Sequence, residues 1–203
     1  PGAGEFVYAT EPVWRMIGPG QEAPENVHAE RDRANLLVSL DQLAIDLPNC
    51  EWVMLVVAWF GDDLRCGSCA IRPGVEIAAK VTQPHAWRVG GVDRAGAHLI
   101  SENDGGPAFG GTPSDASVLQ AIAALKARGY KVGLYPFVLM DVPPGNALPD
   151  PYGAGEQAAY PWRGRIGLHP AAGEVGSPDK TAAATAQVDA FFGDAELADF
   201  GVS

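Results

Sequence analysis

A pattern of helix, glycine and apolar strand constrains the fold more than any other feature of this sequence. Residues 112–129 read TPSDASVLQAIAALKARG, with apolar residues at helical spacing and a closing Gly129. The next run, VGLYPFVLM (132–140), is apolar nearly throughout, and Asp141 ends it. Helical spacing predicts a helix with one buried face, and a continuous apolar run is typical of a strand covered on both faces, as in a parallel sheet.

Local signals mark the ends of this helix. We expect Thr112 to cap it with its hydroxyl, Pro113 to take the first helical position, and Asp115 to add negative charge to the first turn. Gly129 can take the left-handed conformation that closes the helix. Pro136 removes one donor from the following strand, so we expect a bulge or irregular pairing there.

A second helix–strand unit precedes the first. Leucines between Asn35 and Pro48 fall on one helical stripe, and EWVMLVVAWF (51–60) is another continuous apolar run, closed by a Gly-Asp-Asp turn (61–63). Strands that alternate with helices predict an α/β fold with a parallel sheet, either an open doubly wound sheet or a closed (β/α)8 barrel. No GxGxxG follows a strand and no Walker loop is present, so a nucleotide-binding open sheet has no support.

The remaining segments are less regular. Residues 1–34 are predicted to be an irregular arm or linker from an upstream domain, and 35–203 to be one domain. Residues 97–100 are predicted to form a short strand, followed by a turn-rich loop. Residues 142–176 are predicted to form a long Pro/Gly-rich loop, and a last helix is expected to begin at Ser177-Pro178.

Charge and hydropathy exclude several kinds of partner. The net charge of −11 argues against direct binding to nucleic acid or to anionic membrane surfaces. No run of 18 apolar residues exists, so no membrane span is predicted, and no signal peptide is recognised.

The three cysteines do not form a disulfide framework, because their number is odd in a long chain. Cys66 and Cys69 have the spacing of a redox or zinc motif, but the four histidines are scattered singly and supply no second pair of ligands. The helix-breaking residues that follow Cys69 argue against a thioredoxin-like motif. We expect a plain loop or a possible disulfide between Cys66 and Cys69, with no metal and no cofactor.

Acids follow the predicted strands, where ligands meet parallel sheets. Asp62, Glu102 and Asp141 are weak candidates for catalytic carboxylates. Asp141 would either orient a substrate or cap the turn after its strand. We favour the capping interpretation. Asp62 is the better candidate of the Asp62-Asp63 pair, although a turn leaving a strand explains both. Glu102 would need apolar surroundings to act as an acid, and its Ser, Asn and Asp neighbours indicate a wet loop.

Aromatic residues supply weak candidates for ligand binding. Trp59 at a strand end is a candidate platform for a sugar ring, although a tryptophan in that position is more often core. The long loop carries Tyr152, Tyr160 and Trp162, with Arg163 beside them. These side chains suit either a glycan or packing against a neighbouring subunit, and arginine suits carboxylate-bearing partners. Packing is the interpretation that we favour.

Four long segments resemble the TIM-barrel-like domain of gene transfer agent tail proteins. They are WFGDDLRCGSCAIRPGVE (59–76), GGTPSDASVLQAIAALKARG (110–129), LYPFVLMDVPPGN (134–146) and AYPWRGRI (159–166). The resemblance implies that residues 35–203 are the N-terminal part of a glycoside-hydrolase-like barrel, within a larger chain at the tail tip or baseplate of a phage-like particle. Such particles are made in the cytoplasm and released.

The resemblance implies a structural role, with other tail or baseplate proteins, the rest of the same large chain and cell-envelope glycan as partners. The alternative is an active glycoside hydrolase that degrades cell-wall or capsular glycan. Barrel glycosidases of this kind take their carboxylate pair from later strands, and no complete pair is assignable in these residues. A half-barrel leaves strand edges unpaired, so we expect the isolated chain to oligomerise or aggregate.

Overall fold

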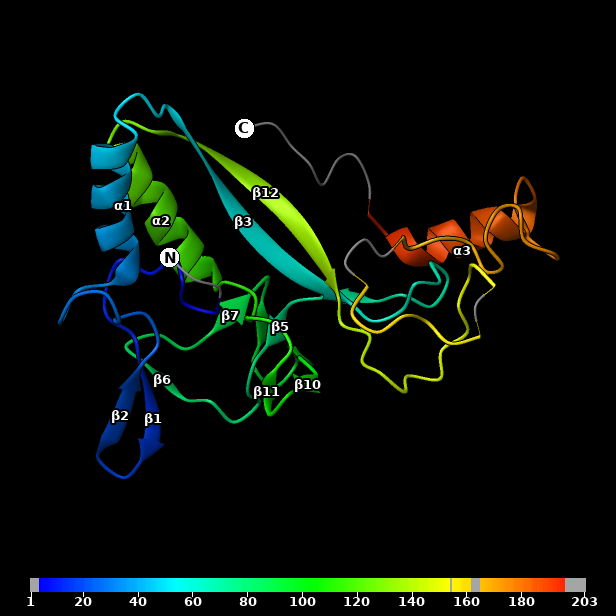
Figure 1. The fold of residues 1–203 in the computed structure, drawn as a ribbon, viewed down its shortest axis with the longest axis horizontal. Coiled ribbons are helices and arrows are strands. Elements are labelled where there is room, and N and C mark those ends of the chain that lie inside the picture. Colours follow the sequence, from blue (N-terminus) through cyan, green and yellow to red (C-terminus); the bar gives the residue numbers. More distant parts are fainter. Residues whose placement is uncertain (1–3, 154, 162–164, 196–203) are drawn as a thin grey trace. The chain divides into compact units, whose positions relative to one another are not determined.

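The computed structural model describes residues 4–153, 155–161 and 165–195 of the chain. It is a mixed α/β fold with several small sheets (Figure 1). The elements, in chain order, are β1 (Trp14–Gly18), β2 (Gln21–Pro24), α1 (Asn35–Asp46), β3 (Trp52–Gly61), β4 (Ile71–Arg72), β5 (Gly74–Val75), β6 (Thr82–Gln83), β7 (Arg88–Val89), β8 (Val92–Asp93), β9 (His98–Leu99), β10 (Glu102–Asn103), β11 (Gly106–Pro107), α2 (Asp115–Ala127), β12 (Lys131–Met140) and α3 (Ala182–Phe192).

The chain divides into two compact units, and each is described by itself. The first unit comprises Pro1–Trp59 and Arg72–Val138, and the second comprises Phe60–Ile71 and Leu139–Ser203. The two longest strands, β3 and β12, belong to both units because each crosses the boundary near its C-terminal end.

The predicted parallel pair of strands is present. β3 lies between β12 and β4 in a three-stranded sheet. The Lys131 amide donates to the Glu51 carbonyl at 2.8 Å, and the Asp141 amide donates to the Gly61 carbonyl at 2.8 Å. The partners are 80 residues apart at both ends of the pair, so β3 and β12 run in the same direction and keep one register, as their arrows in Figure 1 show.

This constant register shows that the bulge expected at Pro136 was wrong. In a parallel pair, alternate residues direct their backbone groups to the partner. Lys131 and Asp141 both face β3, so odd-numbered residues of β12 do so and Pro136 lies in the opposite phase. The missing N–H of Pro136 therefore points to the edge away from β3, where a strand tolerates proline.

Helices α1 and α2 cover one face of β3 and the start of β12 (Figure 1). Further along β12, Leu134 and Val138 are 52% and 41% exposed on that same face. The core between the helices and the strands is formed by five buried side chains: Leu36, Leu40, Leu55, Ala121 and Leu125. The leucine stripe of α1 and the apolar face of α2 were thus predicted correctly at their centres. Leu47 and Leu119 are exposed, because Leu47 follows the last turn of α1 and Leu119 lies off the buried stripe of α2.

The opposite face of β3 and β12 is exposed, which contradicts the expectation that both faces are covered. Trp52, Met54 and Val56 are 60%, 53% and 44% exposed, and Tyr135 is 51% exposed. A side chain at Gly133 would collide with the Met54 sulfur, so residue 133 lies on this face, as do Tyr135 and Phe137 in the same phase. We call Trp52, Met54, Val56, Tyr135 and Phe137 the open face.

The edge of β3 away from β12 is occupied by the two-residue strand β4 and, at Val56, by a side chain. The Tyr8 hydroxyl donates to the Val56 carbonyl at 3.0 Å and accepts from the Val56 amide at 3.0 Å. Burial raises the pKa of Tyr8 above its ordinary value, although the backbone hydrogen bond to Val56 opposes this. The hydroxyl therefore stays protonated at neutral pH and can donate.

The segment predicted to be an irregular arm contains a hairpin and part of the core. Strands β1 and β2 pair antiparallel, and β1 also pairs with β6. Phe6 and Val13 are buried in a second cluster of the first unit, with Val75, Trp87 and Val89. Asn26 fixes this segment, because its side chain accepts from the Val13 amide at 2.8 Å.

The N-terminus of α2 differs from the prediction. Ser114, not Thr112, is the cap, and its hydroxyl accepts from the Ser117 amide at 3.3 Å. The Thr112 hydroxyl instead donates to the Ala58 carbonyl at 2.7 Å and accepts from the Gly74 amide at 2.9 Å. Thr112 is fully buried and joins β3, β5 and the start of α2.

The last helix also starts later than predicted. It begins at Ala182 after a Thr181 cap rather than at Ser177, and Gly193 follows it as expected. Phe191 packs against Leu64, Met140 and the other buried residues of the second unit, whereas Phe192 is 62% exposed. The described part of the chain contains no helix that is long and apolar enough to cross a membrane.

The end of α2 yields a stability prediction. Gly129 has φ +86°, a conformation that costs a residue with a Cβ about 1–2 kcal/mol. We expect Gly129→Ala to lower the free energy of unfolding by about this amount, measured by urea denaturation. Gly155→Ala is the control, since Gly155 has no positive φ and no neighbour within 4 Å of an added Cβ. Equal effects of the two substitutions would contradict the prediction.

Candidate functional site

The C-terminal ends of β3 and β12 place three carboxylates in the second unit. Asp62 and Asp63 follow β3, and Asp141 follows β12. The hydrogen bond from the Asp141 amide to the Gly61 carbonyl makes the two strand ends direct neighbours. The structure therefore brings the predicted candidates Asp62 and Asp141 to one sheet edge.

Asp63 is the most firmly held of these acids. It is 4% exposed and makes a bidentate pair with the Arg65 guanidinium, with Arg65 Nη2 2.6 Å from Oδ2 and Nε 3.0 Å from Oδ1. Gln157 Nε2 also donates to Oδ1 at 2.7 Å. Burial raises the pKa of Asp63, but the hydrogen bonds from Arg65 and Gln157 outweigh it and leave the pKa below its ordinary value. Asp63 is thus a charged structural anchor.

Gln157 links this anchor to the long loop, a role that was not predicted from the sequence. Its side chain is buried, and its carbonyl oxygen accepts from the Leu64 amide at 2.9 Å. Its amide nitrogen donates to Asp63 and, at 3.1 Å, to the Pro149 carbonyl. A single glutamine in an irregular segment carries no sequence signal of such a role.

The two remaining acids of this edge differ in exposure. Asp62 is half-buried, and its Oδ1 accepts from the Ala70 amide at 2.8 Å, which fixes the turn after β3. Asp141 is 4% exposed at the end of β12. Two neighbouring carboxylates can act as an acid and a base or nucleophile only if both reach a substrate. Asp62 already serves the local backbone, which favours the turn interpretation of this residue.

Glu102 belongs to the first unit and lies in an exposed hairpin. It pairs with Pro107 across β10 and β11, and Asp104 and Gly105 have φ +52° and +81° in the two-residue turn between the strands. Such a turn requires positive φ at both central residues, which the Asp-Gly sequence supplies. The wet environment inferred from its neighbours fits this exposed position.

The aromatic candidates occupy two kinds of environment. Trp59 is partly buried and packs against the buried cluster that contains Phe6 and Trp87, which favours the packing interpretation of this residue. Tyr152 is 41% exposed, and its hydroxyl donates to the Arg165 carbonyl at 2.9 Å. The Tyr160 amide donates to the Val142 carbonyl at 2.8 Å. Trp162 and Arg163 lie outside the described residues.

The cysteines are free thiols in the structure, and the possible Cys66–Cys69 disulfide is not formed. Cys66 and Cys69 are 6% and 9% exposed, and burial raises the pKa of the Cys69 thiol. Within the described ranges, no group of three or more His, Cys, Asp or Glu side chains is placed to hold a metal ion. The structure thus offers these cysteines no metal-binding partners in that part of the chain.

The environments of the thiols predict their order of reaction. We expect Cys50, which is half-buried and whose thiol donates to the Trp52 carbonyl, to react first with an aromatic disulfide reagent. Cys66 and Cys69 should react only on unfolding, and Cys50→Ser should remove the fast phase. If only one thiol titrates in the denatured, unreduced chain, the Cys66–Cys69 disulfide exists in solution.

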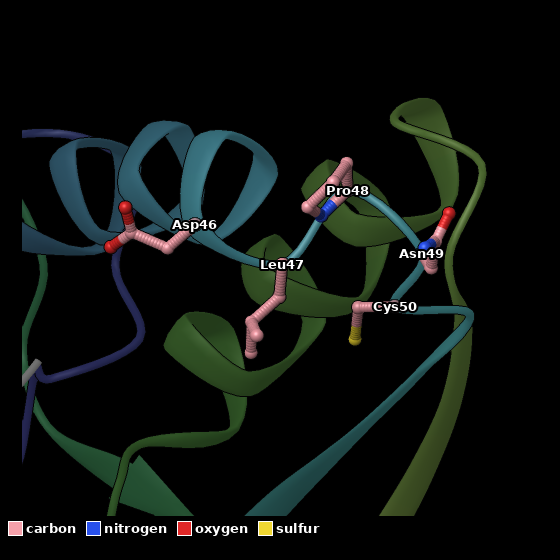
Figure 2. A pocket seen from close by; sticks show the side chains of 5 residues that line it. All are labelled: Asp46, Leu47, Pro48, Asn49 and Cys50. Carbon is pink, nitrogen blue, oxygen red and sulfur yellow. The ribbon is translucent and has the colours of Figure 1, made fainter.

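A cavity lies at the other end of β3. It has a volume of about 520 Å³ and is lined by the segment from Asp46 to Cys50, which connects α1 to β3 (Figure 2). Ligands of parallel sheets bind at the C-terminal ends of strands, whereas this cavity adjoins the N-terminal end. Its lining offers a carboxylate, an amide and a thiol but no charged pair, so it is a weak candidate for a site.

Comparison with known proteins gives no assignment. No protein family matches the chain, and no curated protein matches it.

Proposed function

We propose that this chain is a module of the tail tip or baseplate of a phage-like particle of the gene transfer agent type. In this proposal it contributes part of a TIM-type (β/α) barrel, and its role is structural. Its neighbours would be other tail proteins, further segments of a larger chain and the envelope of a recipient cell. The four resembling segments suggested this assignment, and they contain the C-terminal ends of β3 and β12.

The observation that carries the proposal is the one-sided cover of the parallel pair. In a barrel of this type, helices cover the outer side of each strand, and the inner side packs against other strands. The described helices α1 and α2 lie on one face of β3 and of the start of β12, while the open face is apolar and largely exposed. Such a face would suit a barrel segment whose inner side is covered by further strands.

The carboxylates at the strand ends favour the structural role over hydrolysis. Asp63 is committed to Arg65 and Gln157, and Asp62 to the Ala70 amide. The alternative is a glycoside hydrolase, and the observation in its favour is that Asp62 and Asp141 follow neighbouring strands. Hydrolysis needs two carboxylates that flank one glycosidic bond.

Immunogold labelling tests the structural proposal. Antibodies raised against the chain should label one end of purified phage-like particles from the cells that encode it, and pre-immune serum should not. Particles that contain no trace of the chain by mass spectrometry would overturn the proposal. A zymogram of the folded chain on peptidoglycan tests the alternative. If no clearing is seen, the glycoside hydrolase proposal is wrong.

The open face yields a separate prediction. We expect the isolated chain to self-associate in light-scattering measurements, because large apolar patches on a monomer are usually interaction surfaces. Trp52→Ser combined with Tyr135→Ser should shift the population to monomer. Leu119→Ser is the control, since Leu119 is 65% exposed on α2 and lies outside the open face. A wild-type chain that stays monomeric at high concentration would contradict this.

A further inference from the structure

A second cavity, in the first unit, has a polar lining. Its volume is about 220 Å³, and it is bounded by residues 4–7, the β1–β2 hairpin and the loop after β5. Glu5, Glu76 and Glu25 line it together with Arg15 and His28. It is large enough for a small organic molecule rather than a single water.

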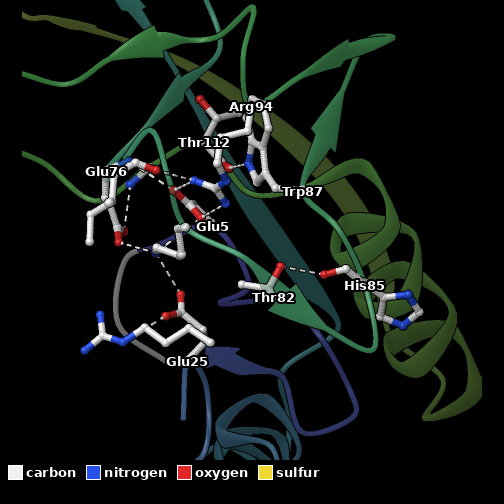
Figure 3. Close-up of polar contacts among 12 residues, drawn as sticks. Glu5, Glu25, Glu76, Thr82, His85, Trp87, Arg94 and Thr112 are labelled. Carbon is white, nitrogen blue, oxygen red and sulfur yellow. Dashed lines mark hydrogen bonds and ion pairs between the residues drawn. The ribbon is translucent and has the colours of Figure 1, made fainter. Parts of the chain in front are cut away.

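The two acids on one side of the cavity are already paired. Arg94 binds Glu5 through two nitrogens, with Nη1 2.9 Å from Oε1 and Nη2 2.5 Å from Oε2. Lys80 Nζ lies 2.9 Å from Glu76 Oε2, and Glu76 Oε1 accepts from the Gly111 amide at 3.1 Å (Figure 3). These carboxylates have no need of a further cation.

Glu25 completes a balance of charge around the cavity. Its Oε2 accepts from Lys80 at 2.9 Å, and its Oε1 lies 3.7 Å from Arg15 Nε. Three carboxylates therefore face three cations, namely Lys80, Arg94 and Arg15. A charged ligand would upset this balance in a partly buried site, and burying an uncompensated charge is costly. A neutral ligand avoids that cost.

Two groups at the cavity lack hydrogen-bond partners among the described residues. Arg15 Nε is buried and donates to no acceptor, because 3.7 Å to Glu25 is too long for a hydrogen bond. Glu25 Oε1 likewise accepts no hydrogen bond within the described part of the chain. A bridging oxygen that both accepts and donates satisfies this pair, and a hydroxyl group has that capacity.

His28 supplies a second donor whose tautomer is fixed by Asn35. The Asn35 Oδ1 accepts from the backbone amides of His28 and Ala29, at 2.8 and 3.1 Å, so its Nδ2 must be the group that faces His28 Nδ1 at 3.0 Å. Nδ2 only donates, so His28 Nδ1 accepts and Nε2 carries the proton. His28 Nε2–H is therefore a donor.

We infer that this cavity binds a neutral, hydroxyl-rich small molecule, such as a saccharide, through two neighbouring hydroxyl groups. One hydroxyl accepts from Arg15 Nε and donates to Glu25 Oε1, and the other accepts from His28 Nε2. The cavity offers two donors and one acceptor at balanced charge, and hydroxyl groups match both donors and acceptors. The inference does not depend on the proposed tail-tip role, because it concerns a different region of the chain.

Titration followed by NMR spectroscopy tests the inference. Glucose and N-acetylglucosamine are added separately to the ¹⁵N-labelled 203-residue chain, and glucuronate serves as a charged comparison at constant ionic strength. We expect at least one neutral sugar to give saturable shifts at the Arg15 side-chain N–H and the Asn35 amide, with a dissociation constant of about 1–10 mM. Glucuronate should bind more weakly than that sugar.

Variants identify the site. Arg15→Gln should weaken sugar binding by about tenfold or more, because the buried unpaired donor of this cavity is lost. His28→Ala should also weaken binding, and its exposed position makes unfolding no concern. Arg31→Gln is the control, since the Arg31 side chain is 94% exposed.

Three outcomes would overturn the inference. No saturable shift with either neutral sugar would mean that the cavity holds only water. Tighter binding of glucuronate would refute the charge argument. Unchanged affinity in folded Arg15→Gln and His28→Ala would place the sugar elsewhere. Each of these outcomes leaves the labelling of particles unaffected, so the two proposals fail separately.

Discussion

Replacing Lys80 with methionine is expected to lower the free energy of unfolding by about 3–5 kcal/mol. The Lys80 side chain is 2% exposed, and its Nζ lies 2.9 Å from Glu25, 2.9 Å from Glu76 and 3.2 Å from Glu5. Removing the ammonium leaves three carboxylates close together with one fewer cation. Urea unfolding at pH 7, followed by tryptophan fluorescence, measures the loss.

An exposed lysine provides the matched control. Lys131 is 58% exposed and pairs with Glu51 at 3.1 Å, so Lys131→Met should cost about 0–1 kcal/mol. If Lys80→Met is no more destabilising than Lys131→Met, the buried cluster does not stabilise the fold, and the argument from its geometry fails.

The effect of Lys80→Met depends on pH with a definite sign. Burial raises the pKa of Glu5, but the hydrogen bond from Arg94 and the charges of Lys80 and Arg94 outweigh it, so the pKa is lowered in the folded state. A lowered pKa stabilises the fold above the unfolded value, about 4.3, and this contribution is lost as the pH falls through the folded value. The difference between wild type and Lys80→Met should therefore hold from pH 7 to about 5 and shrink as the pH falls below about 4.

The alkaline side follows from Lys80 itself. Burial lowers its pKa, but the charges of Glu5, Glu25 and Glu76 outweigh it and raise the pKa above the ordinary value. A raised pKa stabilises the fold below the unfolded value, about 10.4, and the contribution is lost as the pH rises through the folded value. The cluster thus contributes most between about pH 5 and 10.

Thr112→Val is expected to cost about 2–4 kcal/mol, the second largest effect. Valine keeps the shape of threonine but removes the hydroxyl that joins the Ala58 carbonyl to the Gly74 amide. Two backbone groups then lose their partner in the interior, at about 1–3 kcal/mol for each unsatisfied group. The fully buried position of Thr112 leaves no room for water to replace the hydroxyl.

Chemical denaturation of Thr112→Val and Thr185→Val measures this effect against a control. Thr185 lies on the exposed side of α3, and its substitution should change stability by less than about 0.5 kcal/mol. A cost for Thr112→Val within that range would show that the hydroxyl does not hold the three segments together.

The helices and long strands were predictable because their signals are local. The spacing of apolar residues located α1 and α2, and the continuous runs located β3 and β12 to within one or two residues. Gly129 closes α2 with a positive φ, as its position predicted. The parallel direction followed from the helix between the strands, since such a connection is the usual one in α/β folds.

The predictions were wrong where segments distant in the sequence determine a residue's partner or its burial. Thr112 has the sequence context of a helix cap, but β3 and β5 supply competing partners for its hydroxyl. The residues of the open face were predicted to be buried because they are apolar. Whether they are exposed depends on which other segments pack against that face, and the local sequence does not show this. Strands β1 and β2 are short and partly exposed, so their residues carry little alternation.

The candidate site was predictable only in part. Acids at strand ends could be located from the sequence, because strand ends could be located. The sequence could not show which acid is bound to the backbone or to a guanidinium. The partners of Asp63 are nearby Arg65 and Gln157, and Gln157 is 94 residues away in the sequence. The two donors of the second cavity, on Arg15 and His28, could not be predicted either. Their roles depend on contacts with Glu25 and Asn35, which no sequence spacing indicates.

The hydroxyl of Tyr8 gives the sheet a direction of growth. Because one side chain occupies both backbone groups of Val56, another strand cannot hydrogen-bond there unless Tyr8 is displaced. β4 pairs on this same edge, so the other border of the sheet, beside β12, is where a further strand would pair, with Pro136 offering no N–H there. Assembly that adds strands to this sheet would thus use the edge of β12. Tyr8, in the N-terminal segment, would protect the opposite edge from unwanted strand pairing.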